Sequence, residues 1–404
     1  MKYFMLVPDG CGDWPNPSLG GKTPLEAADL THINQLAKIS QVGLVGTIPE
    51  GLKAGSEANV TLLGYGPDAY RIGRAPLEAV AMGIAMAASD VAFRVNLITV
   101  DGSGRFEDLT FKDHSAGEIS TEEAEILMQS LDSALGGRGM RFYAGVGYRG
   151  LGISNWFTGD YKLSPPHDLL HQRVGDHLPQ EGDGAEALRS LICQSHELLK
   201  THPVNQKRIQ NGLRPANSIW IWGYGHKGVL APFQDKYGIA GSVITAVNLI
   251  KGYGLCAGLS VIDVPGADGT LHTNYEGKAL GAIRAFQQGR DFVFLHVEAP
   301  DECSHNGDLN GKIEALAQID AKIFRPILNY LQSTGEPYRI LVVTDHKTLL
   351  ETRAHSAEPV PYVLFDSENR QPPDDGKAFS EVSGAKGVFF ASGQSLADYF
   401  FGSH

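Results

Sequence analysis

Three aspartates and three histidines of this chain stand at or shortly after the ends of apolar segments. They are Asp9 in YFMLVPDG, Asp301 and His305 in FLHVEAPDECSH, Asp345 and His346 in RILVVTDH, and His355 in RAHSAEPVPY. Each alone would indicate only a turn or a structural side chain. Together, carboxylate oxygens and imidazole nitrogens without thiolates form a donor set for divalent ions. Three carboxylates gathered without cations would also repel one another. The set therefore suits two divalent ions such as Mn²⁺ or Zn²⁺. We expect two Mn²⁺ ions, with Zn²⁺, Co²⁺ and Mg²⁺ as the alternatives.

A serine lies in the small-residue segment AGSEAN, ahead of an apolar run. Gly, Ser and Asn are common in turns and at helix N-termini, so this segment alone indicates only a turn. Beside two divalent ions, however, a serine on a turn is a candidate nucleophile. One cation lowers the pKa of the hydroxyl, and the other neutralises the oxygens of a phosphoryl group. We therefore predict that Ser56 is both the nucleophile and a metal ligand.

The apolar segments before these residues are continuous rather than alternating. Such runs, separated by helical stretches such as residues 23–39, 277–288 and 313–332, are typical of strands buried on both faces of a parallel sheet. In open α/β sheets, ligands bind at the carboxyl ends of the strands. We therefore expect an α/β core with a mainly parallel sheet between helices and the metal ligands at its carboxyl edge.

The middle of the chain has a different pattern. Short strands and turns, followed by the stretch LSPPHDLLHQRVGDHLPQEGDGAE, replace the long apolar runs. We expect a smaller α+β domain at residues 89–214, inserted into a discontinuous metal-binding core formed by residues 1–88 and 215–404. A large insertion favours group transfer over simple hydrolysis, because transfer requires an enclosed site whereas hydrolysis requires water.

Composition excludes several classes of protein. The 404 residues are 42% hydrophobic and 20% charged, values typical of a soluble globular protein, and the net charge of −12 argues against nucleic-acid binding. The chain has neither a signal-peptide pattern nor a long apolar span, so we expect no membrane partner. Four scattered cysteines suit the cytoplasm. The spacings G-x-G-x-x-G and G-x-x-x-x-G-K-[ST] are missing, which argues against dinucleotide and P-loop enzymes.

An ordered series of motifs resembles a known family. The segments PDG, GKTPLEAA, AGSEAN, LLGYGP, GRAPLEA, APDECSH, TDH and HSAEPVP follow one another as in the archaeal-type cofactor-independent phosphoglycerate mutases. That family belongs to the alkaline phosphatase metalloenzyme superfamily and carries an inserted substrate-handling domain. The resemblance implies an alkaline-phosphatase-like core that interconverts 2-phosphoglycerate and 3-phosphoglycerate through a phosphoserine. It also implies the ligand sets, which are Asp9, Ser56, Asp345 and His346 for one ion and Asp301, His305 and His355 for the other.

Four cations are candidates for contacts with a small phosphorylated substrate. They are Arg74 in GRAP, Arg94 in FRVN, Arg149 in GYRG and Lys278 in TNYEGKA. Arginine matches phosphate and carboxylate groups bidentately, although ordinary ion pairs remain an alternative for Arg94 and Arg149. A cation is disfavoured at the start of a helix, so we predict a catalytic role for Lys278.

The chain also departs from the family pattern. GSEAN carries Glu57 where relatives commonly have Asp and is one residue shorter, and Glu118 replaces a usual Arg or His. The segments HPVNQKR, ANSIWIWG and TNYEGKA resemble a bacterial subgroup proposed to act as homoserine kinases. A homoserine kinase-like phosphotransferase and a metallophosphatase are therefore the alternatives, and the lack of a nucleotide-binding loop favours the mutase. The oligomeric state is left open.

Overall fold

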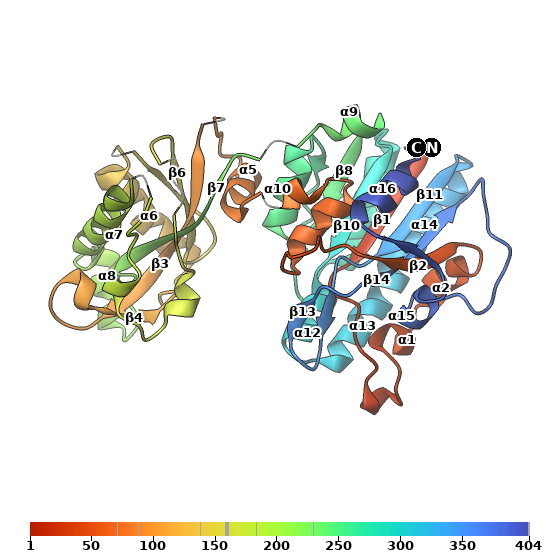
Figure 1. Cartoon of the computed structure of the whole chain (residues 1–404), viewed down its shortest axis with the longest axis horizontal. Helices are drawn as coiled ribbons and strands as arrows, with labels where there is room; N and C mark the ends of the chain where they lie inside the picture. Colours follow the sequence, from red (N-terminus) through yellow and green to blue (C-terminus); the bar gives the residue numbers. More distant parts are fainter. Residues whose placement is uncertain are drawn as a thin grey trace. The chain divides into compact units, whose positions relative to one another are not determined.

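The computed structural model describes residues 1–70, 72–87, 89–137, 139–157, 161–182, 184–228 and 230–402 (Figure 1). The chain forms two compact units, the first made of Met1–Arg71 and Val229–His404 and the second of Ile72–Gly228. The second unit includes α5 (Arg74–Ala81) and β7 (Ser218–His226), which the sequence expectation assigned to the core. Strand β7 belongs there because it pairs with β3 (Val91–Asp101) over most of its length.

The first unit is built on an eight-stranded sheet. Its strand order is β15-β2-β14-β11-β1-β10-β8-β9, and only β14 runs antiparallel to its neighbours. The central strand β1 is buried on both faces, because Phe4, Met5, Leu6 and Val7 are all fully buried. The expected α/β core with a mainly parallel sheet is therefore confirmed. The strands are β1 (Lys2–Pro8), β2 (Gln41–Val45), β8 (Gly241–Ile244), β9 (Ser260–Val261), β10 (Phe292–Val297), β11 (Tyr338–Val343), β14 (Val360–Asp366) and β15 (Val388–Phe390).

Helices cover both faces of this sheet. One face packs against α1, α2, α11, α13 and α14 in a single apolar cluster. On the other face, the ring of Phe401 in α16 lies 5.0 Å from that of Phe292. None of the helices that the structure describes has the length and apolar character needed to cross a membrane. The helices of this unit are α1 (Pro24–Ala27), α2 (Thr31–Ala37), α3 (Asn59–Leu62), α4 (Pro67–Tyr70), α9 (Phe233–Tyr237), α10 (Asn248–Cys256), α11 (Tyr275–Gln287), α12 (Ala299–His305), α13 (Leu309–Ile319), α14 (Arg325–Thr334), α15 (Glu381–Gly384) and α16 (Gly393–Phe401).

The helical stretch expected at residues 313–332 is interrupted. Between α13 and α14 the backbone forms a π-helical turn at Asp320–Phe324. Pro326 cannot donate a main-chain hydrogen bond to the preceding turn, which favours such an interruption. The turn is also anchored by Asp320, whose carboxylate accepts hydrogen bonds from the main-chain N–H groups of His32 and Ile33 at the start of α2.

The second unit is an α+β structure. Its sheet is antiparallel, with β3 at the centre pairing with β4, β6 and β7. Helices α6 and α7 pack on it in one apolar cluster that includes Leu127, Leu188 and Trp220. The other strands and α-helices of the unit are β4 (Thr110–Asp113), β5 (Arg141–Ala144), β6 (Arg149–Ser154), α6 (Thr121–Leu135), α7 (Ala185–Leu199) and α8 (Pro203–Gln210).

A buried ion pair fixes the loops at the carboxyl edge of the first sheet. Lys312 of α13 is fully buried, and its Nζ lies 2.8 Å from Asp13 Oδ2. The same ammonium donates to the carbonyl oxygens of Gly12 and Thr348. Lys312 therefore joins the loop after β1 to α13 and to β12 (Lys347–Leu349).

We predict that Asp13→Asn lowers the free energy of unfolding by about 3 kcal/mol or more, because it leaves the Lys312 ammonium buried without its counter-charge. Urea denaturation of the chelated protein would measure this loss. Asp263→Asn is the matched control, since Asp263 pairs with Lys251 at the surface, where such pairs contribute little. Equal losses in the two variants would contradict the anchoring role of Lys312.

Candidate metal centre and nucleophile

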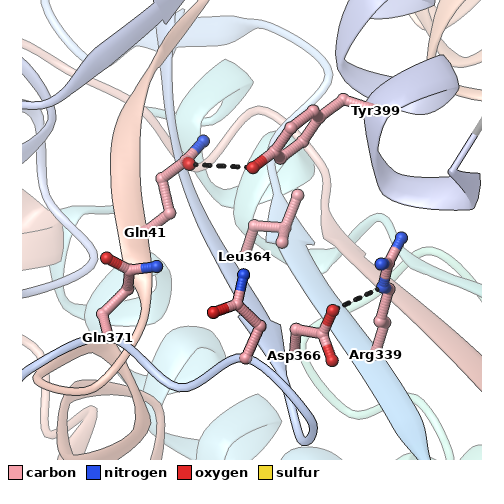
Figure 2. Close-up of a pocket in the computed structure, with 7 residues that line it drawn as sticks. Gln41, Arg339, Leu364, Asp366, Gln371 and Tyr399 are labelled. Carbon is pink, nitrogen blue, oxygen red and sulfur yellow. Dashed lines mark hydrogen bonds and ion pairs between the residues drawn. The ribbon is translucent and has the colours of Figure 1, made fainter. Parts of the chain in front are cut away.

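A small polar cavity of about 160 Å³ lies at one end of the first sheet (Figure 2). Arg339 near the start of β11 forms an ion pair with Asp366 at the end of β14. The cavity therefore lies at the edge opposite the carboxyl ends of β1 and β11. Amides, one ion pair and a tyrosine offer no donor set for a metal ion. Its lining consists of Gln41, Arg339, Leu364, Asp366, Asn369, Gln371 and Tyr399.

The acids and histidines identified in the sequence lie at the other edge. Strand β1 is flanked by β10 and β11, so the carboxyl ends of these three strands are neighbours. Asp9 follows β1, while Asp345 and His346 follow β11. Asp301 and His305 belong to α12, which begins shortly after β10 and places the two side chains on one helical face. His355 lies in β13 (Ala354–Ser356), which pairs with β12.

One group of possible ligands comprises Asp9, Asp345 and His346. All three side chains are essentially buried. His346 Nε2 lies 3.4 Å from Asp9 Oδ1 and 3.6 Å from Asp345 Oδ2. Among the described residues, Asp9 Oδ1 and His346 Nε2 have no hydrogen-bond partner. Buried polar atoms are normally paired, so these orphaned donor atoms fit a divalent cation.

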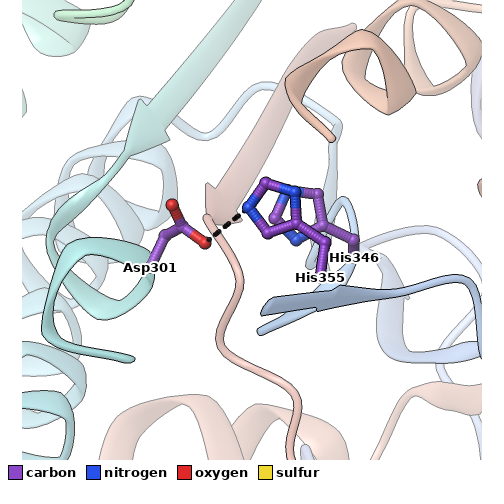
Figure 3. Close-up of side chains that lie close together, drawn as sticks. All are labelled: Asp301, His346 and His355. Atoms are coloured by element: carbon purple, nitrogen blue, oxygen red, sulfur yellow. Dashed lines mark ion pairs between the residues drawn. The ribbon is translucent and has the colours of Figure 1, made fainter. Parts of the chain in front are cut away.

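A second group comprises Asp301, His346 and His355 (Figure 3). His355 Nε2 lies 3.4 Å from Asp301 Oδ1, and the rings of His346 and His355 are 4.1 Å apart. His305 Nε2 is also close, at 3.2 Å from Asp301 Oδ2 and 2.9 Å from His355 Nε2. The structure therefore brings together Asp301, His305 and His355, the residues expected for one ion. His346 belongs to both groups of possible ligands.

The ionisable side chains at this edge shift one another's pKa values. Burial raises the pKa of Asp9 well above its ordinary value, and the neighbouring charges of Asp345 and Asp301 raise it further. Burial would also raise the pKa of Asp301, but hydrogen bonds from His305 and His355 outweigh it and hold the pKa below its usual range. The hydrogen bond to Asp301 raises the pKa of His305 to about 9. Without ions, the carboxylates are thus partly balanced by protons, which divalent cations would replace.

Only glycine fits directly after Asp9. Gly10 has a φ of +57°, and a Cβ there would lie 2.4 Å from Thr348 Oγ1 and 2.5 Å from Asp301 Oδ1. Its main-chain N–H donates to Asp345 Oδ1 at 3.2 Å. The PDG motif therefore allows the end of β1 to approach the other two strand ends closely.

The Ser56 segment is tied to both ligand groups. Ser56 begins a short 3₁₀-helix, Ser56–Ala58, and is half-buried. Asn59 Nδ2 donates to the Ser56 carbonyl at 3.0 Å and to Asp345 Oδ2 at 2.7 Å. His355 Nδ1 lies 3.2 Å from the carbonyl oxygen of Ala54. Sequence reasoning treated Asn59 only as a turn residue, although a polar side chain heading an apolar helix signals a buried contact.

His296 is a buried residue that sequence reasoning missed. It lies in β10, is fully buried, and has Nε2 3.1 Å from Asp9 Oδ2 and 4.0 Å from Asp345 Oδ2. Burial lowers the pKa of His296 to about 4, so its ring is neutral. A histidine inside the apolar run FVFLHV was the available signal, because such strands rarely carry an ionisable residue.

Lys278 lies in the first turn of α11, as expected, but its side chain is fully buried. Its Nζ donates to the main-chain carbonyl of His296 at 3.0 Å. Burial lowers the pKa of Lys278 to about 8. The ammonium therefore contacts β10, and its hydrogen bond goes to the main chain rather than to Ser56.

The three arginines identified in the sequence belong to the second unit. Arg94 lies in β3, with its guanidinium 4.5 Å from the centre of the Trp222 ring and its Nε 3.3 Å from Glu78 Oε2. Burial lowers the pKa of Arg94, and the positive charges of Arg74 and Arg149 lower it further. The three arginines therefore lie close enough to interact electrostatically.

Arg149 begins β6, and its guanidinium lies 4.5 Å from the centre of the Tyr148 ring. The β3–β6 register pairs Arg149 with Asn96, so it is near Arg94 on the adjacent strand. Glu118, the residue that departs from the family pattern, is exposed and has a φ of +51°.

The sequence and the fold are similar to those of known proteins. Residues 37–205 match the family model for 2,3-bisphosphoglycerate-independent phosphoglycerate mutase. A protein of that name from Methanosarcina acetivorans is 45% identical, over 97% of this chain and 98% of that protein. One named as a probable enzyme of this type from Geobacter sulfurreducens is 44% identical, over 92% of each chain.

Two solved structures have folds similar to that of this chain over nearly its full length. The PH0037 protein from Pyrococcus horikoshii has a TM-score of 0.81 and 27% identity, covering 99% of this chain and 97% of that one. A cofactor-independent phosphoglycerate mutase from Thermoplasma acidophilum has a TM-score of 0.68 and 25% identity, covering 100% of this chain and 99% of that one.

We predict that protein reloaded with Mn²⁺ and desalted retains about two ions per chain, as in other two-metal sites. Asp9→Asn and Asp301→Asn should each lose one of them, because each removes a carboxylate from a different group. Elemental analysis measures the content, and Asp263→Asn at the surface is the control. If the folded wild-type protein retained no ion, the metal centre would be refuted.

Proposed function

This chain belongs to the 2,3-bisphosphoglycerate-independent phosphoglycerate mutase family, and we propose that it interconverts 2-phosphoglycerate and 3-phosphoglycerate through a phosphoserine at Ser56. The observation that carries the proposal is the attachment of the Ser56 segment to both ligand groups. Asn59 joins it to Asp345, and Ala54 joins it to His355. A serine beside two cations can be activated as a nucleophile for phosphoryl transfer, because one cation lowers the pKa of its hydroxyl.

In this proposal, two sets of side chains each hold one divalent ion. We expect both ions to be Mn²⁺. Asp9, Asp345 and His346, together with Ser56, would hold one ion. Asp301, His305 and His355 would hold the other. When bound, such ions lower the pKa of the serine hydroxyl and offset the negative charge of the phosphoryl oxygens. Asn59 orients the Ser56 backbone, and Gly10 provides the space in which the strand ends meet.

The transfer proceeds in two balanced steps. Ser56 Oγ forms a bond to the phosphorus of one phosphoglycerate, and the bond from phosphorus to the glycerate oxygen breaks. The serine hydroxyl loses one proton, and the oxygen of the released glycerate gains one. The other hydroxyl of the same glycerate then attacks phosphoserine, which regenerates Ser56 and gives the isomeric phosphoglycerate. Water must be excluded between the steps, because it would hydrolyse the phosphoserine.

We assign substrate handling to the second unit. Arg74, Arg94 and Arg149 gather there, and their guanidinium groups suit the phosphate and carboxylate of a phosphoglycerate. The cation–π contact with Trp222 and the ion pair with Glu78 hold the Arg94 guanidinium in place. Substrate binding at these arginines is thus supported by their proximity to one another.

Lys278 has a positioning role in this account. Its fully buried ammonium donates a hydrogen bond to the main-chain carbonyl of His296. Burial lowers the pKa of Lys278, and the negative charge of Glu298 partly offsets that effect. A side chain with no exposed surface is poorly placed to bind a substrate directly. We therefore replace the catalytic role expected from the sequence with support of β10 beside the ligand groups.

The inferred enzyme is cytoplasmic. None of the four cysteines forms a disulfide, and Cys11 and Cys303 are buried. Free thiols persist in a reducing compartment, which fits an enzyme acting on a small phosphorylated metabolite.

A homoserine kinase-like phosphotransferase is the second candidate, because Glu118 adds an exposed carboxylate to the second unit where an ammonium group could bind. We predict that Mn²⁺-loaded protein converts 3-phosphoglycerate to 2-phosphoglycerate without ATP and forms no phosphohomoserine from homoserine and ATP. Phosphorus NMR of the two separate incubations distinguishes the products. Formation of phosphohomoserine with 3-phosphoglycerate unchanged would assign the site to the kinase.

We predict that Ser56→Ala lowers kcat by at least about a thousandfold, because it removes the covalent nucleophile. The variant should keep its fold and at least one tightly bound ion, as checked by circular dichroism and elemental analysis. Ser103→Ala, at an exposed position, is the matched control and should retain full activity. Activity above about a tenth of wild type in Ser56→Ala would exclude Ser56 as the nucleophile.

A further inference from the structure

The imidazole of His296 occupies an unusual position for a histidine. It projects from β10, the strand beside β1, and the preceding residues Phe294 and Leu295 and the following Val297 are all fully buried. A fully buried imidazole needs a partner at both ring nitrogens, because an unpaired polar atom in the core is costly. The two nitrogens of His296 differ in this respect.

The Nδ1 atom of His296 has a partner in Thr245. Its distance to Thr245 Oγ1 is 3.3 Å, and the same hydroxyl oxygen accepts the main-chain N–H of Val247 at 3.1 Å. The hydroxyl oxygen can also accept a hydrogen bond from Nδ1–H, and the proposal uses the tautomer in which it does so. Nε2 then carries a free lone pair, as a metal-ligating histidine requires.

The Nε2 atom lies among carboxylates without a hydrogen bond to them. It is 3.1 Å from Asp9 Oδ2 and 4.0 Å from Asp345 Oδ2, yet it has no hydrogen-bond partner among the described residues. His346 Nε2 likewise has no hydrogen-bond partner among the described residues and lies 3.4 Å from Asp9 Oδ1. Two ligand atoms on one zinc-like ion are about 3 to 3.5 Å apart for bonds near 2.1 Å. The distances from the two imidazoles to Asp9 therefore fit shared coordination, while Asp345 lies farther from His296.

We propose that His296 is a further ligand of the ion held by Asp9, Asp345 and His346, with Thr245 fixing the orientation of its ring. The inference rests on the paired metal centre of the proposed function. Lys278 helps to hold His296 in position, because its ammonium donates a hydrogen bond to the main-chain carbonyl of His296. A second neutral imidazole beside two carboxylates favours Mn²⁺, Co²⁺ or Zn²⁺ over Mg²⁺, which prefers oxygen ligands.

His296→Leu tests the proposal by removing the nitrogen while keeping an apolar side chain in the core. We expect the Mn²⁺ affinity of one of the two sites to fall at least about tenfold, with a smaller loss in Thr245→Val, which removes only the ring's hydrogen-bond partner. Competition with a chelator measures both affinities. His171→Asn is the matched control, because His171 is exposed and Asn tolerates its φ of +68°.

Thermal unfolding separates a ligand from a core residue. In the chelated protein, His296→Leu should unfold at about the same Tm as wild type, because it removes an unpaired nitrogen together with the hydrogen bond to Thr245. The rise in Tm on adding Mn²⁺ should shrink, since that rise reflects binding to the folded state. A lower Tm in chelator with an unchanged rise and affinity would mean that His296 only packs in the core, and would overturn the proposal.

A spectroscopic measurement avoids any change at His296. In Asp301→Asn, which should retain the first ion alone, electron spin-echo spectra of Mn²⁺ with ¹⁵N-labelled histidine should show two coupled imidazole nitrogens. One coupled nitrogen, from His346 only, would overturn the proposal. If wild-type protein bound no Mn²⁺ at all, the paired metal centre itself would fail, which is a distinct outcome.

Discussion

The structure depends on holding three carboxylates together at one edge of a sheet. Asp9, Asp301 and Asp345 are 1%, 7% and 0% exposed, so water screens their charges poorly. Their mutual repulsion is offset by imidazoles and, in the function that we propose, by two divalent ions. The energetic cost of gathering these groups explains why the surrounding loops are so closely constrained. A looser edge would let the carboxylates separate and lose the geometry needed for transfer.

The parallel sheet makes this gathering possible. Strands β1, β10 and β11 are far apart in sequence but adjacent in the sheet. Asp9 and Asp345 follow β1 and β11, and Asp301 lies in the helix that follows β10. Gly10 allows the end of β1 to lie close to Thr348 and Asp301. Lys312 joins the loop after β1 to β12. Asn59 and His355 then attach the Ser56 segment to the same edge. Fold and site are thus linked through a few buried polar contacts.

Much of this arrangement could be predicted from the sequence, since continuous apolar runs that end in acids identify buried parallel strands. The α/β core with its mainly parallel sheet was predicted correctly. His296 and Asn59 were missed because their roles depend on which atoms face one another after folding, and periodicity does not report side-chain direction in a fully buried strand. The anchoring pair of Asp13 and Lys312 joins distant segments, so no local pattern could reveal it. The buried position of Lys278 likewise follows from packing against β10.

In the function that we propose, one edge of the sheet holds two ions beside Ser56. Anomalous diffraction from crystals of Mn²⁺-loaded protein, collected above and below the manganese absorption edge, tests it most directly. We expect two difference peaks, one within reach of Asp9, Asp345 and His346 and the other within reach of Asp301, His305 and His355. A single peak, or peaks away from these side chains in fully loaded protein, would contradict it.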